Sequence, residues 1–561
     1  MMTSIRSLFR KETLGGDAVA GLVLGVESVP DGLAGGLLAG VNPIYGLYGY
    51  LFGMAGGALA TSSVFMTVQA TGAMAIVVAD VGLSSYGEDE PRALFTLAIL
   101  TGVVMLIAGI LKLGSILRFV SNAVMVGFIS AVGINIILGQ LDNFTGYEAE
   151  GANRVARTFD LILNPTSVDL TTLLIGVLTI VLIVTLEKTP MGPLGMVLAV
   201  IVGSAIVPLL DLDVAQLRDI TEIPSGLPAP TWPLLSAIPA LLIPALSLAF
   251  VGLVQGAGIS AGFPNPDGEY PDASRDFMGQ GVGNVVSGIF QGMPVGGSMS
   301  ASSLVKTAGS KTRLAQFIAA AVMAVIILLF GDLVGYIAMP ALAGLLMLVG
   351  FRTIKPDEII AVWKTGTLYA VVMAVTLALT IIIPLQYAVL VGVGISMILY
   401  VVRQSNDLVV KQFVFVDGSR REVDPPAEVP GDAVTVIQPY GSLFFASAAI
   451  FEDQLPDVTP DSSNSVVIIR LRGRNDLGST LTEVLGRYAE ALDGVGSRLV
   501  IITDSTTVLG QLEATGVTDI IGSEDIYTSD EWVGKTLRRA YADAETWVAS
   551  NADPSGEPDE A

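Results

Sequence analysis

The chain contains neither cysteine nor histidine among its 561 residues. The lack of cysteine excludes disulfide bonds and thiol chemistry, and the lack of histidine excludes a Ser-His-Asp triad, histidine–zinc sites and histidine proton relays. Any ionic chemistry must therefore use carboxylates, hydroxyls, amides and the backbone. Nothing in the sequence combines a nucleophile with a base, so an enzyme is the least favoured class of protein.

Charged residues are also scarce. They make up 14% of the chain, hydrophobic residues make up 52%, and the mean hydropathy is +0.68. A soluble enzyme of this length would carry far more charge, so the composition predicts a polytopic membrane protein. Arg6, Arg10 and Lys11 precede the first apolar run without a small-residue cleavage site, which favours a first span over a removed signal peptide.

Negative charge is concentrated towards the C-terminus. The formal net charge is −23, and the residues from Gln404 onward include 27 acidic and 11 basic side chains, a net charge of −16. The preceding part of the chain carries the remaining −7. Such an acidic region argues against nucleic acid as a partner.

Fourteen apolar segments predict membrane spans, several of them too short to cross alone. The predicted spans are residues 17–40, 45–60, 66–81, 93–111, 121–141, 170–186, 194–210, 233–261, 277–293, 298–308, 314–330, 338–351, 367–383 and 386–402. With a cytoplasmic N-terminus, the inner connections carry eleven lysines and arginines, and the outer ones carry only Arg92, Arg154, Arg157 and Arg218. This bias predicts a multi-pass protein of the plasma membrane with both termini in the cytoplasm.

Two of these segments are short and interrupted. "TSSVFMTVQATGAMA" (61–75) follows the second span, and "MPVGGSMSASSLVKTAG" (293–309) follows the ninth. Seven spans separate them, which predicts a seven-plus-seven repeat whose second half is inverted. Inverted repeats with broken helices at matching positions indicate a binding site near the bilayer midplane. Non-helical backbone persists at that depth only where protein or a water-filled cavity satisfies its hydrogen bonds.

The broken segments predict an anion site. A half-helix presents unpaired N–H groups and a positive dipole end, so two opposed half-helices would bind an anion without a formal cation. The alternative is a glycine- and serine-rich seam for helix packing. Pro294, Gly296 and Gly297 cluster at the start of their segment instead of recurring along one face, which favours the anion site.

Glu27 and Asp31 are carboxylates within the first predicted span. A charged carboxylate at the centre of a spanning helix costs about 2.5–3.5 kcal/mol. Their spacing of four residues places both on one helical face, with Pro30 between them. Two ionised carboxylates would repel each other there, so one takes up a proton or a cation lies between them. We expect Asp31, together with Glu27, to bind a coupling ion, Na⁺ or H⁺. The alternative for Glu27 is a snorkelling side chain or one paired with a buried amide.

Two long segments carry a family resemblance. "DAVAGLVLGVESVPDGLAGGLLAGVNPIYGLYGYLFG" and "FMGQGVGNVVSGIFQGMPVGGSMSASSLVKTAGSKT" resemble the SulP (sulfate permease-like) anion transporters, which are related to the animal solute-carrier 26 group. The C-terminal part resembles a STAS domain, the regulatory module of these proteins. The resemblance implies an α-helical membrane fold of fourteen spans with core and gate domains, followed by a cytosolic α/β STAS domain. It also implies a homodimer whose anion lies between the N-termini of spans three and ten.

The resemblance also implies the residues of the site. Matched position by position, the substrate-binding residues are Thr67, Val68, Gln69, Ala70, Gly297, Ser298, Met299, Ser300 and Ala301. The chain departs from the family pattern at Gln69-Ala70, where many members have Gly-Pro, and at Ala301, where many have arginine. Gln255 matches a position that is often a carboxylate, and Asp31 matches one that is often glutamine. The candidate coupling-ion residues are therefore Glu27, Asp31, Gln255 and Ser302, with a possible Na⁺ at Asp31 and no other cofactor.

The expected domains follow from the changes in composition. They are a cytosolic N-terminus (1–16), a transmembrane domain (17–403), a linker (404–431), a STAS domain (432–547) and a disordered acidic tail (548–561). Alternating strands and helices predict an α/β layer structure for the STAS domain. STAS domains often carry an Asp-Ser-Ser-Gly motif with a phosphorylatable serine after the central strand, which implies regulation there and a regulatory protein partner. In the matching loop "RNDLGSTL", Asp476, Ser479 and Thr480 are present but the full motif is not. The alternative is that Ser479 or Thr480 serves only as a helix N-cap.

The leading hypothesis is a secondary active transporter of a small inorganic oxyanion, sulfate or bicarbonate, coupled to Na⁺ or H⁺ through an elevator-type motion. A nucleobase permease of the same fold is the alternative, in which Gln69, Gln255 and Asp31 would face base edges. The STAS domain and the "GNxxSGxFxGxPxxGS" run count against it. A membrane-anchored signalling module is a third class, but fourteen spans with interrupted helices exceed what an anchor needs.

Overall fold

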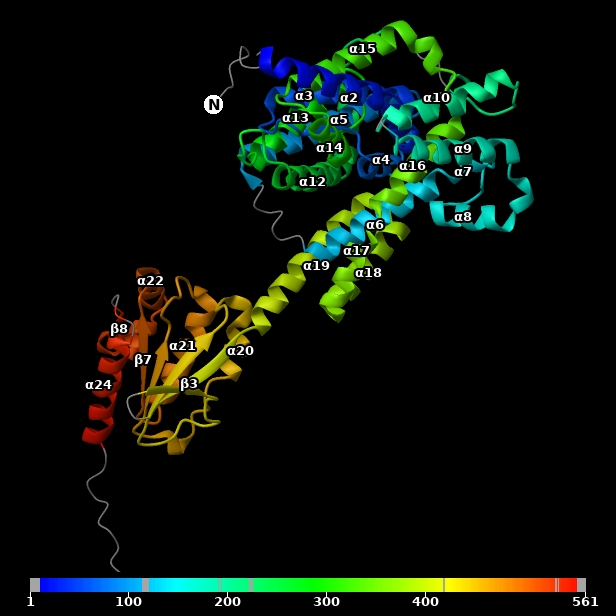
Figure 1. Ribbon diagram of the computed structural model, residues 1–561. Helices are drawn as coiled ribbons and strands as arrows, with labels where there is room; N and C mark the ends of the chain where they lie inside the picture. The colour runs from blue at the N-terminus through cyan, green and yellow to red at the C-terminus, as the bar shows by residue number, and fades with distance from the viewer. Residues whose placement is uncertain are drawn as a thin grey trace, which may run out of the picture. The chain divides into compact units, whose positions relative to one another are not determined.

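The computed structural model describes residues 11–113, 121–189, 191–192, 194–220, 226–416, 419–529, 532 and 534–551. The chain forms two compact units, Met1–Ser396 and Met397–Ala561. The first unit is helical and the second contains a mixed sheet covered by helices (Figure 1). A helical membrane part followed by an α/β domain is the order that the composition predicted.

Eight helices of the first unit pack together around α3 and α13. They are α2 (Lys11–Leu38), α3 (Pro43–Ala60), α4 (Gly72–Ala79), α5 (Glu90–Ile110), α12 (Ile238–Gly262), α13 (Ala273–Ile289), α14 (Met299–Thr307) and α15 (Leu314–Val334). Helix α13 packs against α3 and α5, and α15 runs along α2 (Figure 1). Glycines let α2 and α3 approach each other closely as well: a Cβ atom built on Gly46 of α3 would lie 2.1 Å from the carbonyl oxygen of Gly32 of α2.

A second group of helices packs around α6 and α16. The group comprises α6 (Asn122–Gly139), α7 (Leu141–Thr145), α8 (Arg154–Leu163), α9 (Leu170–Leu186), α10 (Leu194–Leu209), α16 (Met339–Thr353), α17 (Pro356–Thr365) and α18 (Thr367–Ile382). A short helix, α11 (Leu217–Ile220), precedes α12, and α19 (Leu385–Asn406) ends the helical run. Here too glycines bring backbones together, because a Cβ atom on Gly133 of α6 would lie 2.6 Å from the Gly350 oxygen of α16.

Several helices have the length and composition of membrane spans. Within the described residues, five meet both criteria: Thr13–Leu38, Leu83–Ile110, Asn122–Gly139, Leu235–Gly262 and Leu314–Val334. Three shorter apolar helices are Leu170–Leu186, Leu194–Leu209 and Thr367–Ile382. Large apolar side chains such as Leu174 (57% exposed) and Leu329 (71% exposed) cover outward faces, which suits lipid rather than water.

The second unit is built on a six-stranded sheet of order β4-β3-β5-β6-β7-β8. Its strands are β3 (Val409–Val416), β4 (Ser419–Val423), β5 (Val434–Tyr440), β6 (Val466–Arg470), β7 (Arg498–Thr503) and β8 (Ile526–Thr528). Strands β5 to β8 are parallel, and β3 is antiparallel to both β4 and β5.

Helices cover both faces of this sheet. One face packs against α20 (Ala448–Asp453), α21 (Gly478–Asp493), α22 (Thr506–Ala514) and α23 (Val517–Ile521). The other packs against α24 (Lys535–Asn551). Alternate residues of β6 divide between the two cores: Val467 and Ile469 face α21, whereas Ile468 faces α24. Burial on both faces explains why the first four residues of this strand, "VVII" (466–469), are apolar without interruption.

Several predicted boundaries are wrong. The linker predicted at 404–431 contains β3 and β4, because Val410 and Phe413 give β3 a buried face and its backbone pairs with β5. Residues 548–551 belong to α24, and residues 11–16 belong to α2. The rest of the predicted tail, 552–561, and residues 1–10 lie outside the described residues.

The N-cap interpretation of Ser479 and Thr480 is also wrong. Helix α21 begins at Gly478 with Leu477 as its N-cap residue, so both hydroxyl residues lie inside the first turn and are exposed. The side chain of Asp476, one residue before the cap, accepts a hydrogen bond from the Gly478 amide at 3.1 Å. The Asp476 carboxylate, and not a hydroxyl, therefore accepts a hydrogen bond from a backbone amide at the start of α21.

Candidate functional site

Two short strands lie where the first unit's two broken helices begin. Strand β1 (Thr67–Gln69) pairs antiparallel with β2 (Gly296–Ser298), and Thr67 lies opposite Ser298. Helix α4 starts at Gly72, shortly after β1, and α14 starts at Met299, directly after β2. Because the strands are antiparallel, the two helix N-termini flank the pair from opposite ends.

Each half-helix begins with a hydroxyl cap. The Thr71 side chain accepts a hydrogen bond from the Met74 amide, and the Ser298 side chain accepts one from the Ala301 amide, both at 3.4 Å. The first turn of a helix has four N–H groups without an acceptor inside the helix, and a cap satisfies only one. Both helix starts can therefore donate hydrogen bonds to an anion.

Side chains from neighbouring helices satisfy the extended backbone around β1 and β2. The bonds are Thr67 N to Ser302 Oγ (3.0 Å), Gly297 N to Gln280 Oε1 (3.0 Å), Val295 N to Asn284 Oδ1 (2.9 Å), Asn284 Nδ2 to Val295 O (2.5 Å), Ser287 Oγ to Met293 O (2.7 Å) and Gln316 Nε2 to Met66 O (2.7 Å). Unpaired backbone groups are costly at membrane depth. This arrangement explains why amides and serines occur inside apolar spans.

Two fully buried carboxylates fix the ends of the broken segments. Asp276 of α13 accepts hydrogen bonds from the segment before β1, including Thr61 Oγ1 (2.6 Å) and the Ser62 amide (2.7 Å), and from Ser260 Oγ of α12 (2.7 Å). Asp17 of α2 accepts from the backbone amides of Lys311 (2.7 Å) and Thr312 (2.9 Å) after α14. Neither residue stood out in the sequence, because the partners of both are distant along the chain.

The predicted substrate residues divide into buried and open positions. Thr67, Val68, Gln69 and Ala70 are at most 3% exposed, and Gly297, Ser298 and Ala301 are also buried. Met299 and Ser300, in the first turn of α14, are exposed. Span three, predicted at residues 66–81, begins as a strand and not as a helix: Thr67–Gln69 form β1, because their backbone pairs with β2, and α4 begins at Gly72.

Gln255 directly, and Asp31 through Tyr50, are linked to the residues that precede α4. Tyr50 Oη of α3 lies 2.7 Å from Asp31 Oδ2 and 2.9 Å from the Ala70 carbonyl oxygen. On α12, Gln255 Oε1 accepts a hydrogen bond from Thr71 Oγ1 at 2.9 Å. The structure thus brings Asp31 and Gln255 to the start of one half-helix, from two different helices.

The other two candidate coupling residues, Ser302 and Glu27, make no hydrogen bond with Ala70 or Thr71 before α4 in the described part of the chain. Ser302 accepts from the Thr67 amide, so it holds β1 against α14. Glu27, one turn before Asp31, is 8% exposed and makes no hydrogen bond or ion pair with the residues that the structure describes. Between the two carboxylates, Ser28 Oγ accepts from Gln69 Nε2 at 2.7 Å, while Gln69 Oε1 has no partner among the described residues.

Sequence reasoning missed Thr71, Tyr50, Gln280 and Asn284. Thr71 had a usable signal, since a threonine directly before an apolar run is typical of an N-cap. Gln280 and Asn284 are four residues apart and so share one face of α13, which marks a polar face in an apolar span. Tyr50 had no local signal, because both of its partners are distant in sequence.

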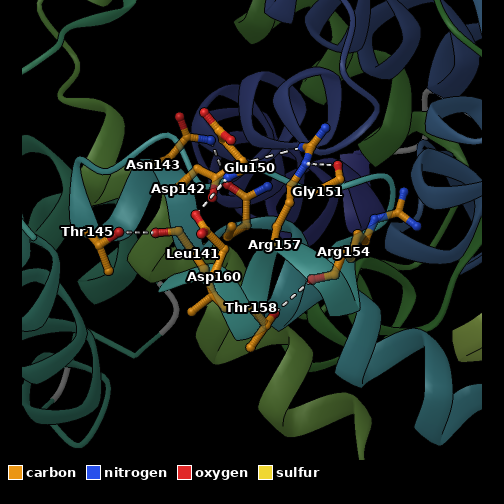
Figure 2. Close-up of polar contacts among 11 residues, drawn as sticks. Leu141, Asp142, Asn143, Thr145, Glu150, Gly151, Arg154, Arg157, Thr158 and Asp160 are labelled. Carbon is orange, nitrogen blue, oxygen red and sulfur yellow. Dashed lines mark hydrogen bonds and ion pairs between the residues drawn. The ribbon is translucent and has the colours of Figure 1, made fainter. Parts of the chain in front are cut away.

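A cavity of about 1010 Å³ adjoins the other end of α4. Asp80, the C-cap residue of α4, lines it and pairs with Arg154 of α8 at 2.9 Å. Arg157 of α8 lies 3.8 Å from Asp142 of α7, and its Nε donates to the Gly151 carbonyl at 3.4 Å (Figure 2). Burial raises the pKa of the Asp142 carboxyl, and Arg157 opposes that shift. Both arginines are among the four basic residues predicted for outer connections.

A helical membrane unit with two broken helices joined through their strands, followed by an α/β domain, defines a class of membrane transporter. The model of the Sulfate permease family matches residues 14–376, and the chain belongs to this family. The family resemblance found in the sequence is thereby confirmed, and the protein is a multi-pass membrane transporter, not an enzyme.

Named relatives agree with this assignment. A "Probable sulfate transporter" of Mycobacterium tuberculosis (strain H37Rv) is 25% identical over 543 residues, covering 95% of this chain and 96% of the relative. The "Bicarbonate transporter BicA" of Picosynechococcus sp. is 27% identical over 403 residues, covering 70% and 71%. The relatives of this chain therefore include proteins named for two different anions.

Solved structures share the fold. The murine solute carrier 26 family member A9 anion transporter in its inward-facing state superposes with a TM-score of 0.82 at 18% identity, covering 96% of this chain and 93% of that one. The transmembrane domain of the cyanobacterial bicarbonate transporter gives a TM-score of 0.59 at 25% identity, covering 70% and 98%. The first of these matches includes the α/β domain as well as the helical unit.

Proposed function

We propose that this protein is a secondary active transporter of a small inorganic oxyanion, sulfate or bicarbonate, which binds between the N-termini of α4 and α14. The pairing of Thr67 with Ser298 carries the proposal, because it holds two half-helix starts on either side of one strand pair. Helix N-termini bind anions through free N–H groups and the positive end of the helix dipole. Ala301 leaves the first turn of α14 without the arginine that many members have, so these backbone groups supply the attraction.

We place the coupling ion, Na⁺ or H⁺, at Asp31, with Glu27 as the second carboxylate. Asp31 reaches the Ala70 carbonyl through Tyr50, so a cation at Asp31 acts on the segment that begins α4. Two carboxylates one turn apart in a membrane-spanning helix repel each other, which favours uptake of a proton or a cation. If the ion is Na⁺, the carboxylate oxygens of Asp31 and Glu27 would bind it, because hard cations prefer oxygen ligands.

The motion that we propose is of the elevator type. The helices around α3 and α13 carry both half-helices, whereas the group around α6 and α16 carries none of the candidate substrate-binding or coupling residues. We assign the first group as the core and the second as the gate, in fourteen spans of two inverted halves. The Arg154–Asp80 ion pair, which links α8 of the gate to α4 of the core, would have to break or shift during this motion.

The remaining parts of the proposal concern location and regulation. We place the protein in the plasma membrane with both termini in the cytoplasm, as the distribution of basic residues favours. A homodimer, and a regulatory protein at the STAS domain, are expected from the family. Ser479 and Thr480 are exposed in the first turn of α21, which leaves them accessible for phosphorylation.

Uptake into proteoliposomes tests the proposal. The purified full-length protein would be assayed with labelled sulfate and labelled bicarbonate under imposed Na⁺ and proton gradients. We expect one of the two anions to accumulate, and one of the two gradients to drive it. The family match and the relatives give no support to a nucleobase substrate, and uptake of labelled uracil with neither anion transported would overturn the proposal.

A further inference from the structure

The hydroxyl of Tyr50 lies between two oxygen atoms that belong to different parts of the site. It is 2.7 Å from Asp31 Oδ2 on α2 and 2.9 Å from the carbonyl oxygen of Ala70, between β1 and the N-cap of α4. Tyr50 is 3% exposed, so the protein supplies these contacts with little competition from water. Both distances are those of O–H···O hydrogen bonds.

The two contacts cannot both be full hydrogen bonds when Asp31 is ionised. A phenol has one hydrogen to donate, and a carboxylate and a carbonyl only accept. With Asp31 ionised, the Tyr50 hydrogen points to the carboxylate and the Ala70 carbonyl loses its donor. With Asp31 protonated, its O–H donates to Tyr50 Oη, and the Tyr50 O–H donates to Ala70. Once Asp31 is protonated, the change at Tyr50 needs only rotation of its hydroxyl, and the proton stays on Asp31.

We propose that Tyr50 is a positioning residue that transmits the protonation state of Asp31 to the start of α4. A proton on Asp31 turns the Tyr50 hydroxyl to the Ala70 carbonyl, which fixes the peptide immediately before Thr71 and the first-turn N–H groups. Loss of the proton releases that peptide. Proton and anion then favour each other's binding, as linkage requires. This inference rests on the proposed coupling role of Asp31.

Few other ionisable groups can compete for this role. Glu27, one turn earlier on α2, is the other carboxylate that acts on this pair. The facing residues of β1 and α12, Gln69 and Gln255, are neutral, and neither α4 nor α10 has an ionisable residue. The other helices that contact α2 carry, besides the Tyr45 and Tyr48 hydroxyls of α3, ionisable residues only near their C-terminal ends: Lys306, Asp332 and Arg352.

Amide hydrogen exchange of residues 70–75 tests the proposal without knowledge of the substrate. The full-length protein in lipid nanodiscs would be compared at pH 6 and pH 8, with rates corrected for intrinsic exchange. In the unmodified protein we expect at least threefold greater protection at pH 6. Asp31→Asn should be protected at both pH values, because the asparagine N–H can donate to Tyr50 Oη. Tyr50→Phe should be unprotected at both, and the double variant should match Tyr50→Phe.

Tyr48→Phe is the matched control. Tyr48 lies on the same helix and is equally buried, but its hydroxyl is directed to the Gly226 carbonyl at 3.4 Å, so this variant should retain the pH dependence. Retention of that dependence in Tyr50→Phe, or low protection of Asp31→Asn at pH 8, would overturn the relay. The second result does not require Tyr50→Phe to fold. A different result would overturn the coupling proposal: anion uptake by Asp31→Asn that depends on the Na⁺ and proton gradients in the same way as uptake by the unmodified protein.

Discussion

Thr67 lies opposite Ser298, and its amide donates a hydrogen bond to Ser302 Oγ one turn into α14, at 3.0 Å. Residues from the two halves of the chain are therefore joined both by strand pairing and by a side chain. The helix starts on either side of this junction are held in place before any ligand arrives. Preorganised donors of this kind bind an anion without the cost of ordering the backbone.

Ser302→Ala should weaken this junction. The change leaves the buried Thr67 N–H without its acceptor, which costs about 1–3 kcal/mol. We expect a lower unfolding temperature in detergent and slower anion uptake. Ser303→Ala is the control, because Ser303 is the adjacent serine and is exposed. Equal unfolding temperatures for the two variants would contradict the role of Ser302.

Asp276→Asn should destabilise the folded protein more than Ser302→Ala does. The carboxylate is fully buried and accepts from two backbone amides and three hydroxyls, so the –NH₂ group of asparagine would face hydrogen-bond donors. We expect a loss of about 3 kcal/mol or more, seen as poor yield of folded protein. Asp272→Asn should be neutral, because Asp272 is an exposed N-cap and asparagine caps equally well. Normal yield of Asp276→Asn would contradict the anchoring role.

The Arg154–Asp80 ion pair should affect the rate of transport. Its side chains are 22% and 15% exposed, so the pair is only partly screened. Arg154→Glu should slow uptake by repelling Asp80, and the exchanged pair Asp80→Arg with Arg154→Glu should restore much of the rate. The measurement is a double-mutant cycle on the initial uptake rate, with a coupling of at least about 0.5 kcal/mol. Strictly additive effects would show that the pair does not act across the two helix groups.

Asp169 should make stability depend on pH. As the N-cap of α9, it accepts hydrogen bonds from the Thr172 hydroxyl and amide, which lower the pKa of its carboxyl. A lowered pKa in the folded state adds stability above the unfolded value of about 3.9, and this stability is lost as the pH falls through the folded value.

Asp169→Ala should therefore cost about 1 kcal/mol at pH 7 and progressively less as the pH falls below about 4. Thermal unfolding in detergent at pH 7, 5 and 3.5 measures the difference. Asp169→Asn is the control, since asparagine retains a cap without titrating. A difference between Asp169→Ala and the unmodified protein that grows towards low pH would have the wrong sign.

Local patterns predicted the broken helices but not their partners. Pro294, Gly296 and Gly297 marked the second break, and the predicted half-helix start agrees closely with α14 at Met299. The start of α4 was misplaced, because Thr67–Gln69 become a strand only through pairing with β2, far along the chain. Asp17 and Asp276 were missed for the same reason. Strand β3 was missed because polar and proline residues nearby masked a short run with β-strand propensity.

The central claim is that an anion lies at the exposed start of α14, and cysteine protection tests it most directly. The chain has no cysteine, so Ser300→Cys and Ser303→Cys each introduce a single thiol on α14. Labelling by a membrane-impermeant thiol reagent would be followed in the purified protein with increasing sulfate or bicarbonate. The account predicts that one of these anions slows labelling at position 300 by at least fivefold and leaves position 303 unchanged. Equal labelling of position 300 with and without saturating amounts of both anions would contradict it.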